Sequence, residues 1–251
     1  MHALDKGVLL VIESVARYFI TADEIAVERA AGAPTQNVRL YLLGSAMGCL
    51  LHLRGVFALH ANAIEFSGTA AAFMGASGDG KSTLAAWFAD KGYRVLADDV
   101  CAVRFNVEGE PTVSPGLRRL RLWKDALEAR GLVTSKFRKS YAGIDEFEKY
   151  DVPLAPEMQT TQGCLLRAIY VLGRSDQPSI TGVQGRDALE LLFNHTYRGQ
   201  YLDRVGSARQ HWASCVRLVA AVPVFRFERR WDLGAIAEDC ALVSRHFSAL
   251  S

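Results

Sequence analysis

The residues from Gly75 to Ser82, which read Gly-Ala-Ser-Gly-Asp-Gly-Lys-Ser, have the clearest chemical meaning in this sequence. Glycines at such positions let the backbone turn its N–H groups onto phosphate oxygens, while the lysine reaches the β- and γ-phosphates. The hydroxyl of the serine after the lysine is a ligand for Mg²⁺. The pattern therefore predicts a phosphate-binding loop (P-loop) that holds a nucleoside triphosphate with Mg²⁺ through Gly75, Ala76, Ser77, Gly78, Asp79, Gly80, Lys81, Ser82 and Thr83.

The segments on either side of this loop have the periodicity of a strand and of a helix. Residues 69–74 form a short apolar run. Residues 82–91 carry apolar side chains at helical spacing, at Leu84, Ala85, Phe88 and Ala89. A helix that begins at the loop would add the attraction of its dipole for phosphate. The alternative is a chance glycine-rich turn, and the predicted strand and helix argue against it.

A histidine is expected to lie beside this loop. Residues 56–66 and 69–74 predict two strands joined by Ser67-Gly68, a two-residue hairpin turn. In that register His60 lies opposite Gly75, and cross-strand partners are about 5 Å apart. A slip of one residue would move His60 to the other face. The alternative role for His60 is to fill the end of a strand, but its expected position beside the triphosphate favours a catalytic one.

Two adjacent acids, Asp98 and Asp99, follow the short predicted strand 94–97. A right-handed crossover through the helix places this strand parallel to strand 69–74, with its carboxyl end beside the loop. Since neighbouring side chains on an extended chain point to opposite faces, one carboxylate can hold Mg²⁺ while the other accepts a proton from an attacking hydroxyl. The alternative is a turn or a helix cap, where Asp is common.

Basic residues concentrate between Arg118 and Lys139, where eight Lys and Arg accompany two acids for a net charge of +6. This segment predicts a surface for triphosphate or an acidic peptide, with Arg118, Arg119, Arg121 and, more weakly, Lys149 as candidate substrate residues. The polar stretch 133–163 reads as largely irregular, and long loops of this kind are often functional. A solvated helix face is an equally weighted alternative for the basic segment.

Composition indicates an ordinary globular protein. The 251 residues are 50% hydrophobic and carry a net charge of +2, which argues against a nucleic-acid partner. The five cysteines are far apart and indicate neither disulfides nor a zinc site. No secretory signal is evident, and the longest apolar stretch, residues 41–51, is too short to span a membrane. We therefore expect a cytoplasmic protein without a membrane partner, and the sequence leaves homo-oligomers open.

The remaining patterns predict a single α/β domain over residues 1–251. Residues 1–55 read as a small N-terminal unit of β-strands and a helix from Pro34 to Leu53, and residues 56–251 as the nucleotide-binding and catalytic core. The core elements expected after residue 99 are a hairpin (100–106 and 111–113), a helix (120–130), a strand (165–172), two helices (187–193 and 207–219), a strand (222–227) and a helix (233–247).

Taken together, Leu59-His60, the loop, and Gly92-Tyr-Arg-Val-Leu-Ala-Asp-Asp-Val100 resemble the catalytic core of bacterial HPr kinase/phosphorylase. The resemblance covers about 45 residues. It implies a P-loop kinase core of the type shared with phosphoenolpyruvate carboxykinases, a mixed sheet flanked by helices. It also implies catalytic roles for Asp99 as base, His60 as its partner and Lys81 as phosphate ligand, with Ser82 and Asp98 on the metal side.

The layout of the whole chain is similar to the short HPr-kinase-like serine kinases, which carry an element like Pro115 to Trp123. Some members of that group phosphorylate the terminal serine of a lasso-peptide precursor. The resemblance implies an ATP- and Mg²⁺-dependent kinase that phosphorylates a serine hydroxyl of a peptide or small protein, such as that precursor. The alternatives are a non-catalytic nucleotide switch or ATPase, and a kinase of a small metabolite.

Overall fold

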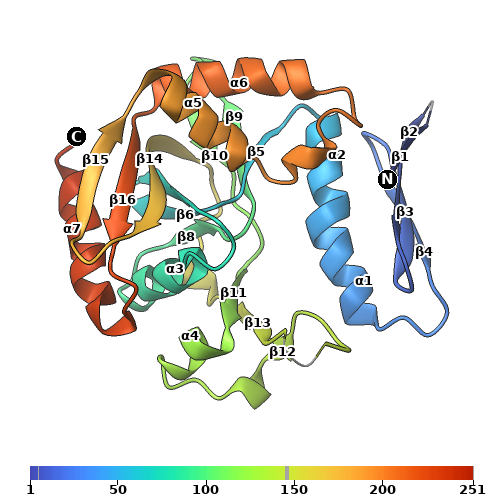
Figure 1. Cartoon of the computed structure of the whole chain (residues 1–251), viewed down its shortest axis with the longest axis horizontal. Coiled ribbons are helices and arrows are strands. Elements are labelled where there is room, and N and C mark those ends of the chain that lie inside the picture. Colours follow the sequence, from blue (N-terminus) through green and yellow to red (C-terminus); the bar gives the residue numbers. More distant parts are fainter. Residues whose placement is uncertain (5, 145–146, 251) are drawn as a thin grey trace.

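The N-terminal unit is a four-stranded antiparallel sheet packed on one long helix. The computed structural model describes residues 1–4, 6–144 and 147–250. Tyr18 is fully buried in one apolar cluster with Cys49 of the helix, and its hydroxyl donates a hydrogen bond to the carbonyl oxygen of Val38 at 2.8 Å. Figure 1 shows this sheet at the right edge of the molecule. Its strands are β1 (His2–Leu4), β2 (Gly7–Ile12), β3 (Ala16–Ile20) and β4 (Ile25–Arg29).

The long helix begins after Pro34 and is not uniform. It consists of α1 (Thr35–Tyr41), a π-helical turn (Leu42–Ala46) and α2 (Met47–Leu53). Gly48 lies where a Cβ atom would approach Cε1 of Tyr197 to 2.9 Å. The glycine therefore lets a segment near residue 197 pack directly on this helix.

The central sheet is mixed and contains nine strands in the described residues. Its order is β5-β9-β10-β14-β7-β6-β8, with β16 beside β14 and β15 beside β16. Among the strand pairs that the structure describes, only β7–β14 and β14–β16 are parallel. The strands are β5 (Phe57–Leu59), β6 (Ala61–Phe66), β7 (Thr69–Met74), β8 (Val95–Ala97), β9 (Cys101–Phe105), β10 (Pro111–Val113), β14 (Cys164–Arg174), β15 (Ser179–Val183) and β16 (Val224–Arg229).

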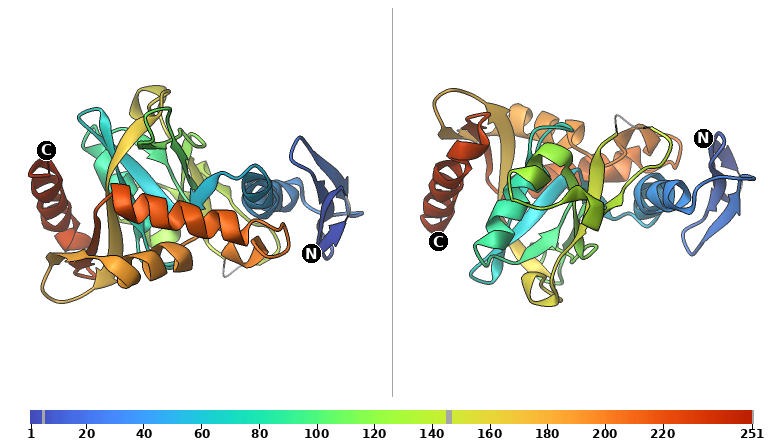
Figure 2. Two further views of the ribbon diagram at one scale, coloured as in Figure 1. Left: turned by 90° about the horizontal axis from the view of Figure 1, so that it is seen from above. Right: turned by 90° about the horizontal axis from the view of Figure 1, so that it is seen from below.

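Helices cover both faces of this sheet, so the predicted mixed α/β arrangement is confirmed. Helices α5 (Gly185–Asn194) and α6 (Ala208–Ala221) pack on one face. Helices α3 (Lys81–Asp90) and α7 (Ile236–Ser248) pack on the other. The view from above shows α6 lying across the sheet (Figure 2). Among the described residues, no helix combines the length and apolar character needed to cross a bilayer.

The β6–β7 hairpin has the predicted register, with Phe66 opposite Thr69 and Ala61 opposite Met74. The predicted strand 56–66 is nevertheless interrupted at His60. The N–H group of His60 donates to the carbonyl oxygen of His195 at 2.7 Å. Because this bond turns the chain away from the hairpin, β5 pairs with β9 instead. His60 therefore lies at a corner between two strands.

The helix predicted over residues 120–130 is wrong in its first part. Residues Arg119–Trp123 form strand β11, and the helix α4 covers only Lys124–Glu128. The segment Arg-Leu-Arg-Leu-Trp alternates, and Leu120 and Leu122 are buried on one face of the strand. This period of two is the signature of a strand rather than a helix.

The stretch 133–163 is more regular than predicted. Strands β12 (Arg138–Lys139) and β13 (Lys149–Pro153) pair with each other, and β13 also pairs with β11. The result is a small three-stranded sheet of order β11-β13-β12 beside the central one. Residues 145–146 of this stretch lie outside the described residues. The local pattern did not predict β13, because this strand pairs with β11 across about 25 intervening residues.

Candidate functional site

The glycine loop connects β7 to the first turn of α3, so the predicted order of strand, loop and helix is confirmed. Gly78 and Gly80 have φ angles of +97° and +77°, a region that favours glycine. The Asp79 carboxylate accepts a hydrogen bond from the N–H group of Ala76 at 2.6 Å and closes the loop on itself. Binding of phosphate by this loop stays a prediction.

Lys81, the first residue of α3, is buried and folded back onto the loop. Its ammonium group donates to the carbonyl oxygens of Gly75 (2.8 Å) and Ala76 (2.9 Å) and to Nε2 of His60 (3.1 Å). Burial lowers the pKa of Lys81 to about 8. All three N–H groups of this ammonium are thus engaged within the protein, and its contact with phosphate stays a prediction.

His60 links Lys81 to Asp99. An ammonium group can only donate, so Nε2 of His60 accepts from Lys81 and the ring proton is on Nδ1. Nδ1 then donates to the backbone carbonyl oxygen of Asp99 at 3.1 Å. Burial, followed by the charge of Lys81, lowers the pKa of His60 to about 4. His60 is therefore neutral near pH 7, and the predicted closeness of His60 to the loop is confirmed.

Asp99 is held in an unusual conformation and in contact with two other side chains. Its φ angle is +74°, which L-residues seldom adopt. One carboxylate oxygen lies 3.0 Å from Nη1 of Arg121, and the other lies 3.5 Å from Nδ1 of His60. Burial would raise the pKa of Asp99, but the charge of Arg121 and of the other neighbouring cations outweighs it and lowers the pKa. The Asp99 side chain is therefore an ionised carboxylate.

Asp98 differs from Asp99 in its contact with Ser82, although both acids contact Arg121, Asp98 through the backbone N–H group and Asp99 through the guanidinium. Its carboxylate accepts from the Ser82 hydroxyl at 2.9 Å and from the backbone N–H group of Arg121 at 2.7 Å. Burial, together with Asp99, raises its pKa. A serine hydroxyl beside a carboxylate at the start of a helix supplies the oxygen ligands that Mg²⁺ prefers. In the described part of the chain, no group of three or more His, Cys, Asp or Glu side chains could hold a metal ion.

An open cavity of about 520 Å³ extends from the loop over His60 and Asp99. A hollow of about 30 Å³ adjoins it at Lys81, Ser82 and Thr83. The structure therefore brings most of the predicted site residues to one place. The larger cavity is lined by His60, Gly75, Ala76, Ser77, Asp99, Arg121, Trp123, Phe147, Lys149, Asn194, His195, Thr196, Tyr197, Arg198 and Gln200.

The predicted substrate residues divide into two groups. Arg121 and Lys149 line the cavity, and the Lys149 ammonium lies 5.5 Å from the centroid of the Trp123 ring. Burial lowers the pKa of Lys149. Arg118 is exposed, whereas Arg119 forms an ion pair with Asp151 and lines a separate hollow against α1.

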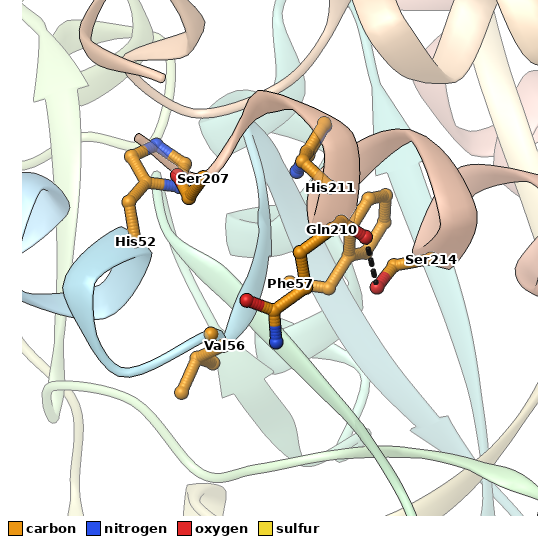
Figure 3. Close-up of a pocket in the computed structure, with 8 residues that line it drawn as sticks. His52, Val56, Phe57, Ser207, Gln210, His211 and Ser214 are labelled. Atoms are coloured by element: carbon orange, nitrogen blue, oxygen red, sulfur yellow. Dashed lines mark hydrogen bonds between the residues drawn. The ribbon is translucent and has the colours of Figure 1, made fainter. Parts of the chain in front are cut away.

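The far wall of the cavity, residues 194–198, was not predicted. His52 donates a hydrogen bond from Nε2 to the carbonyl oxygen of Tyr197 at 2.8 Å, and Nε2 of His211 lies 2.7 Å from the Thr196 hydroxyl. Figure 3 shows these two histidines at a pocket between α2 and α6. The pocket holds only about 10 Å³, so its side chains support the wall rather than a ligand. The run of polar residues directly after α5 is the feature of the sequence that could have indicated this wall.

No protein-family model matches the chain, and no curated protein matches it. Among solved structures, 98 chains match. One is the HPr(Ser) kinase/phosphatase from Coxiella burnetii, matched at 12% identity and a TM-score of 0.43 over 77% of this chain and 92% of that chain. A likeness of this size carries no argument about the fold or the activity of this chain.

Proposed function

We propose that this protein is an ATP-dependent kinase that transfers the γ-phosphoryl group to a serine hydroxyl of a peptide or small protein. The observation that carries the proposal is the convergence of Lys81, His60 and Asp99 beside the glycine loop and at the edge of the cavity. Phosphoryl transfer depends on a cation that holds the phosphates and on a carboxylate that orients the attacking hydroxyl. Lys81 and Asp99 supply these two groups.

Each residue has a distinct task in this scheme. Lys81 exchanges at least one of its bonds to the loop carbonyls for a charge-assisted bond to phosphate. Asp99 accepts the proton of the acceptor hydroxyl as the new oxygen–phosphorus bond forms and ADP leaves. His60 positions both groups through its two ring nitrogens. Mg²⁺ bound by Ser82 and Asp98 would neutralise charge on the phosphate oxygens.

The cavity favours a peptide acceptor. Its volume of about 520 Å³ is within the range of ligand sites in proteins. Its charged side chains are the Asp99 carboxylate and the cations Arg121, Lys149 and Arg198, and aromatic rings also line it. This excess of positive charge suits a hydroxyl that is accompanied by a carboxylate, as in a C-terminal serine. The precursor of a lasso peptide is such an acceptor, and the segment Pro115–Trp123 is what suggests it.

The test is transfer of label from [γ-³²P]ATP to three matched acceptors in the presence of Mg²⁺. They are a peptide that ends in serine, the same peptide extended by one alanine, and free serine. We expect label on the first peptide. Label on free serine alone would instead indicate a kinase of small metabolites. Label released only as inorganic phosphate would leave a nucleotide switch or an ATPase.

The variant Asp99→Asn tests the assignment of the base. It should bind ATP normally and lose transfer by about 10²- to 10⁴-fold, the usual range for general base catalysis. Lys81→Ala should weaken binding and transfer together. Asp23→Asn, an exposed change in the loop between β3 and β4, is the matched control and should behave as the wild type. If Asp99→Asn transfers phosphate at the wild-type rate, the base is another residue, and Asp98 is the next to test.

A further inference from the structure

A pair of stacked side chains, Arg174 and Trp231, lies beside the glycine loop and outside the set of residues that line the cavity. The guanidinium carbon of Arg174 is 3.5 Å from the centroid of the Trp231 ring. Trp231 is 54% exposed although it is one of the largest apolar side chains of the protein. The indole and the guanidinium are both flat groups, so an exposed pair of this kind can stack against the ring of a ligand.

Strand topology explains why these two residues meet at the loop. Arg174 and Arg229 are paired partners at the carboxyl ends of the parallel strands β14 and β16, and Trp231 follows two residues later. The strands lie side by side in Figure 1, and β14 also pairs with β7, whose carboxyl end carries the loop. Carboxyl ends of neighbouring parallel strands meet at one edge of a sheet, where ligands bind in α/β proteins.

Direct contacts join this pair to the loop. Arg229 is buried and donates from Nη2 to the carbonyl oxygen of Asp79 at 2.8 Å, while Arg174 lies 3.5 Å from the Asp79 carboxylate. A Cβ atom on Gly80 would lie 3.8 Å from the Trp231 ring and would collide with the Arg229 guanidinium. The absence of a side chain at Gly80 thus lets Arg229 and the indole approach the backbone that precedes Lys81.

The direction of a bound nucleotide follows from the sheet order. The residues proposed for the γ-phosphate, His60 and Asp99, lie on the β6 and β8 side of β7. Strands β14 and β16 lie on its other side. If the γ end of a triphosphate points toward Asp99 and the triphosphate is extended, its nucleoside is directed to the other side of the loop, where β14 and β16 end.

We propose that Trp231, backed by Arg174, is the platform on which the base of the nucleotide stacks, with a purine favoured because it covers more of the indole. This inference rests on the proposed binding of ATP at the loop and adds the residue that recognises the nucleoside. Stacking involves the face of the nucleotide base and makes no contact with the phosphates. Loss of the platform should therefore affect ATP and leave inorganic tripolyphosphate unaffected.

The experiment measures the affinity of the full-length protein for ATP and for tripolyphosphate, each with Mg²⁺, by calorimetry. Trp231→Ala should weaken ATP binding about five- to a hundredfold, the usual effect of removing an aromatic platform. Binding of tripolyphosphate should change by less than twofold. Trp212→Ala is the matched control, because Trp212 is 50% exposed but lies on α6. The Trp123→Ala variant tests the indole on the cavity side of the loop.

A second measurement covers the case in which Trp231→Ala does not fold. ATP should change the tryptophan fluorescence of the wild type and of Trp212→Phe, and this change should be lost in Trp231→Phe. Unchanged ATP affinity in Trp231→Ala, equal losses of ATP and tripolyphosphate, or a loss confined to Trp123→Ala would each overturn the platform. If the wild type binds neither ligand, the proposed kinase function fails together with it.

Discussion

Protonation of Lys81 should control the affinity for ATP between pH 7 and pH 10. Burial lowers the pKa of Lys81 to about 8. About nine-tenths of the molecules then carry the ammonium at pH 7, and about one-tenth carry it at pH 9. A neutral amine offers the phosphates no charge, so the association constant should fall as the pH rises through 8. Well above that pH the decrease should approach about tenfold per pH unit.

The assay is kcat/KM for ATP, which reports the ionisations of the free enzyme. Lys81→Arg is the control, because a guanidinium stays protonated over this range and should flatten the profile. The neighbouring groups His60, Asp99 and Lys149 are unchanged in that variant, so the difference between the two profiles belongs to Lys81. A flat wild-type profile, or the same slope in Lys81→Arg, would refute the reasoning.

The remaining predictions concern the loop and the basic residues. Gly80→Ala should lower the free energy of unfolding in urea by more than the roughly 1–2 kcal/mol expected for a left-handed alanine, because its Cβ also meets Arg229. Gly78→Ala, with open space around its Cβ, should show the backbone cost alone, and equal losses would mean that Arg229 moves freely. Arg121→Gln should shift the acid limb of kcat/KM to higher pH, since it removes the guanidinium that lowers the pKa of Asp99. Arg118→Gln should leave that limb in place, and parallel shifts would point to a general effect of charge.

Local sequence patterns were sufficient to predict the position of the glycine loop between a strand and a helix, and the closeness of His60 to it. The turn at Ser67-Gly68 fixes the register of β6 and β7, and that register placed His60 near Gly75. The bond from His60 to His195 was not foreseeable, since its partner is about 135 residues away in the sequence. It ended the hairpin one residue early without moving His60 from the loop.

Predictions failed where two periodicities overlapped. Leu120 and Leu127 have a spacing that suits a helix, but the alternation from Arg119 to Trp123 suits a strand. Pairing with β13 decides between them, because it buries Leu120 and Leu122 and turns Arg121 toward Asp99. The wall at Tyr197 depends on two buried histidines from distant helices, and no motif marks such long-range contacts.

The residues proposed for the chemistry come from one continuous part of the chain. His60, Lys81, Ser82, Asp99 and Arg121 all lie within about 60 residues. The cavity wall at 194–198 and the stacked pair at 174 and 231 come from elsewhere in the sequence. Under the proposed function, substitutions in those outer segments would change the preference for an acceptor or a nucleotide and leave the proposed reacting groups unchanged. A change of substrate would then require substitutions in these three stretches, around residues 174, 194–198 and 231, and none among the reacting groups.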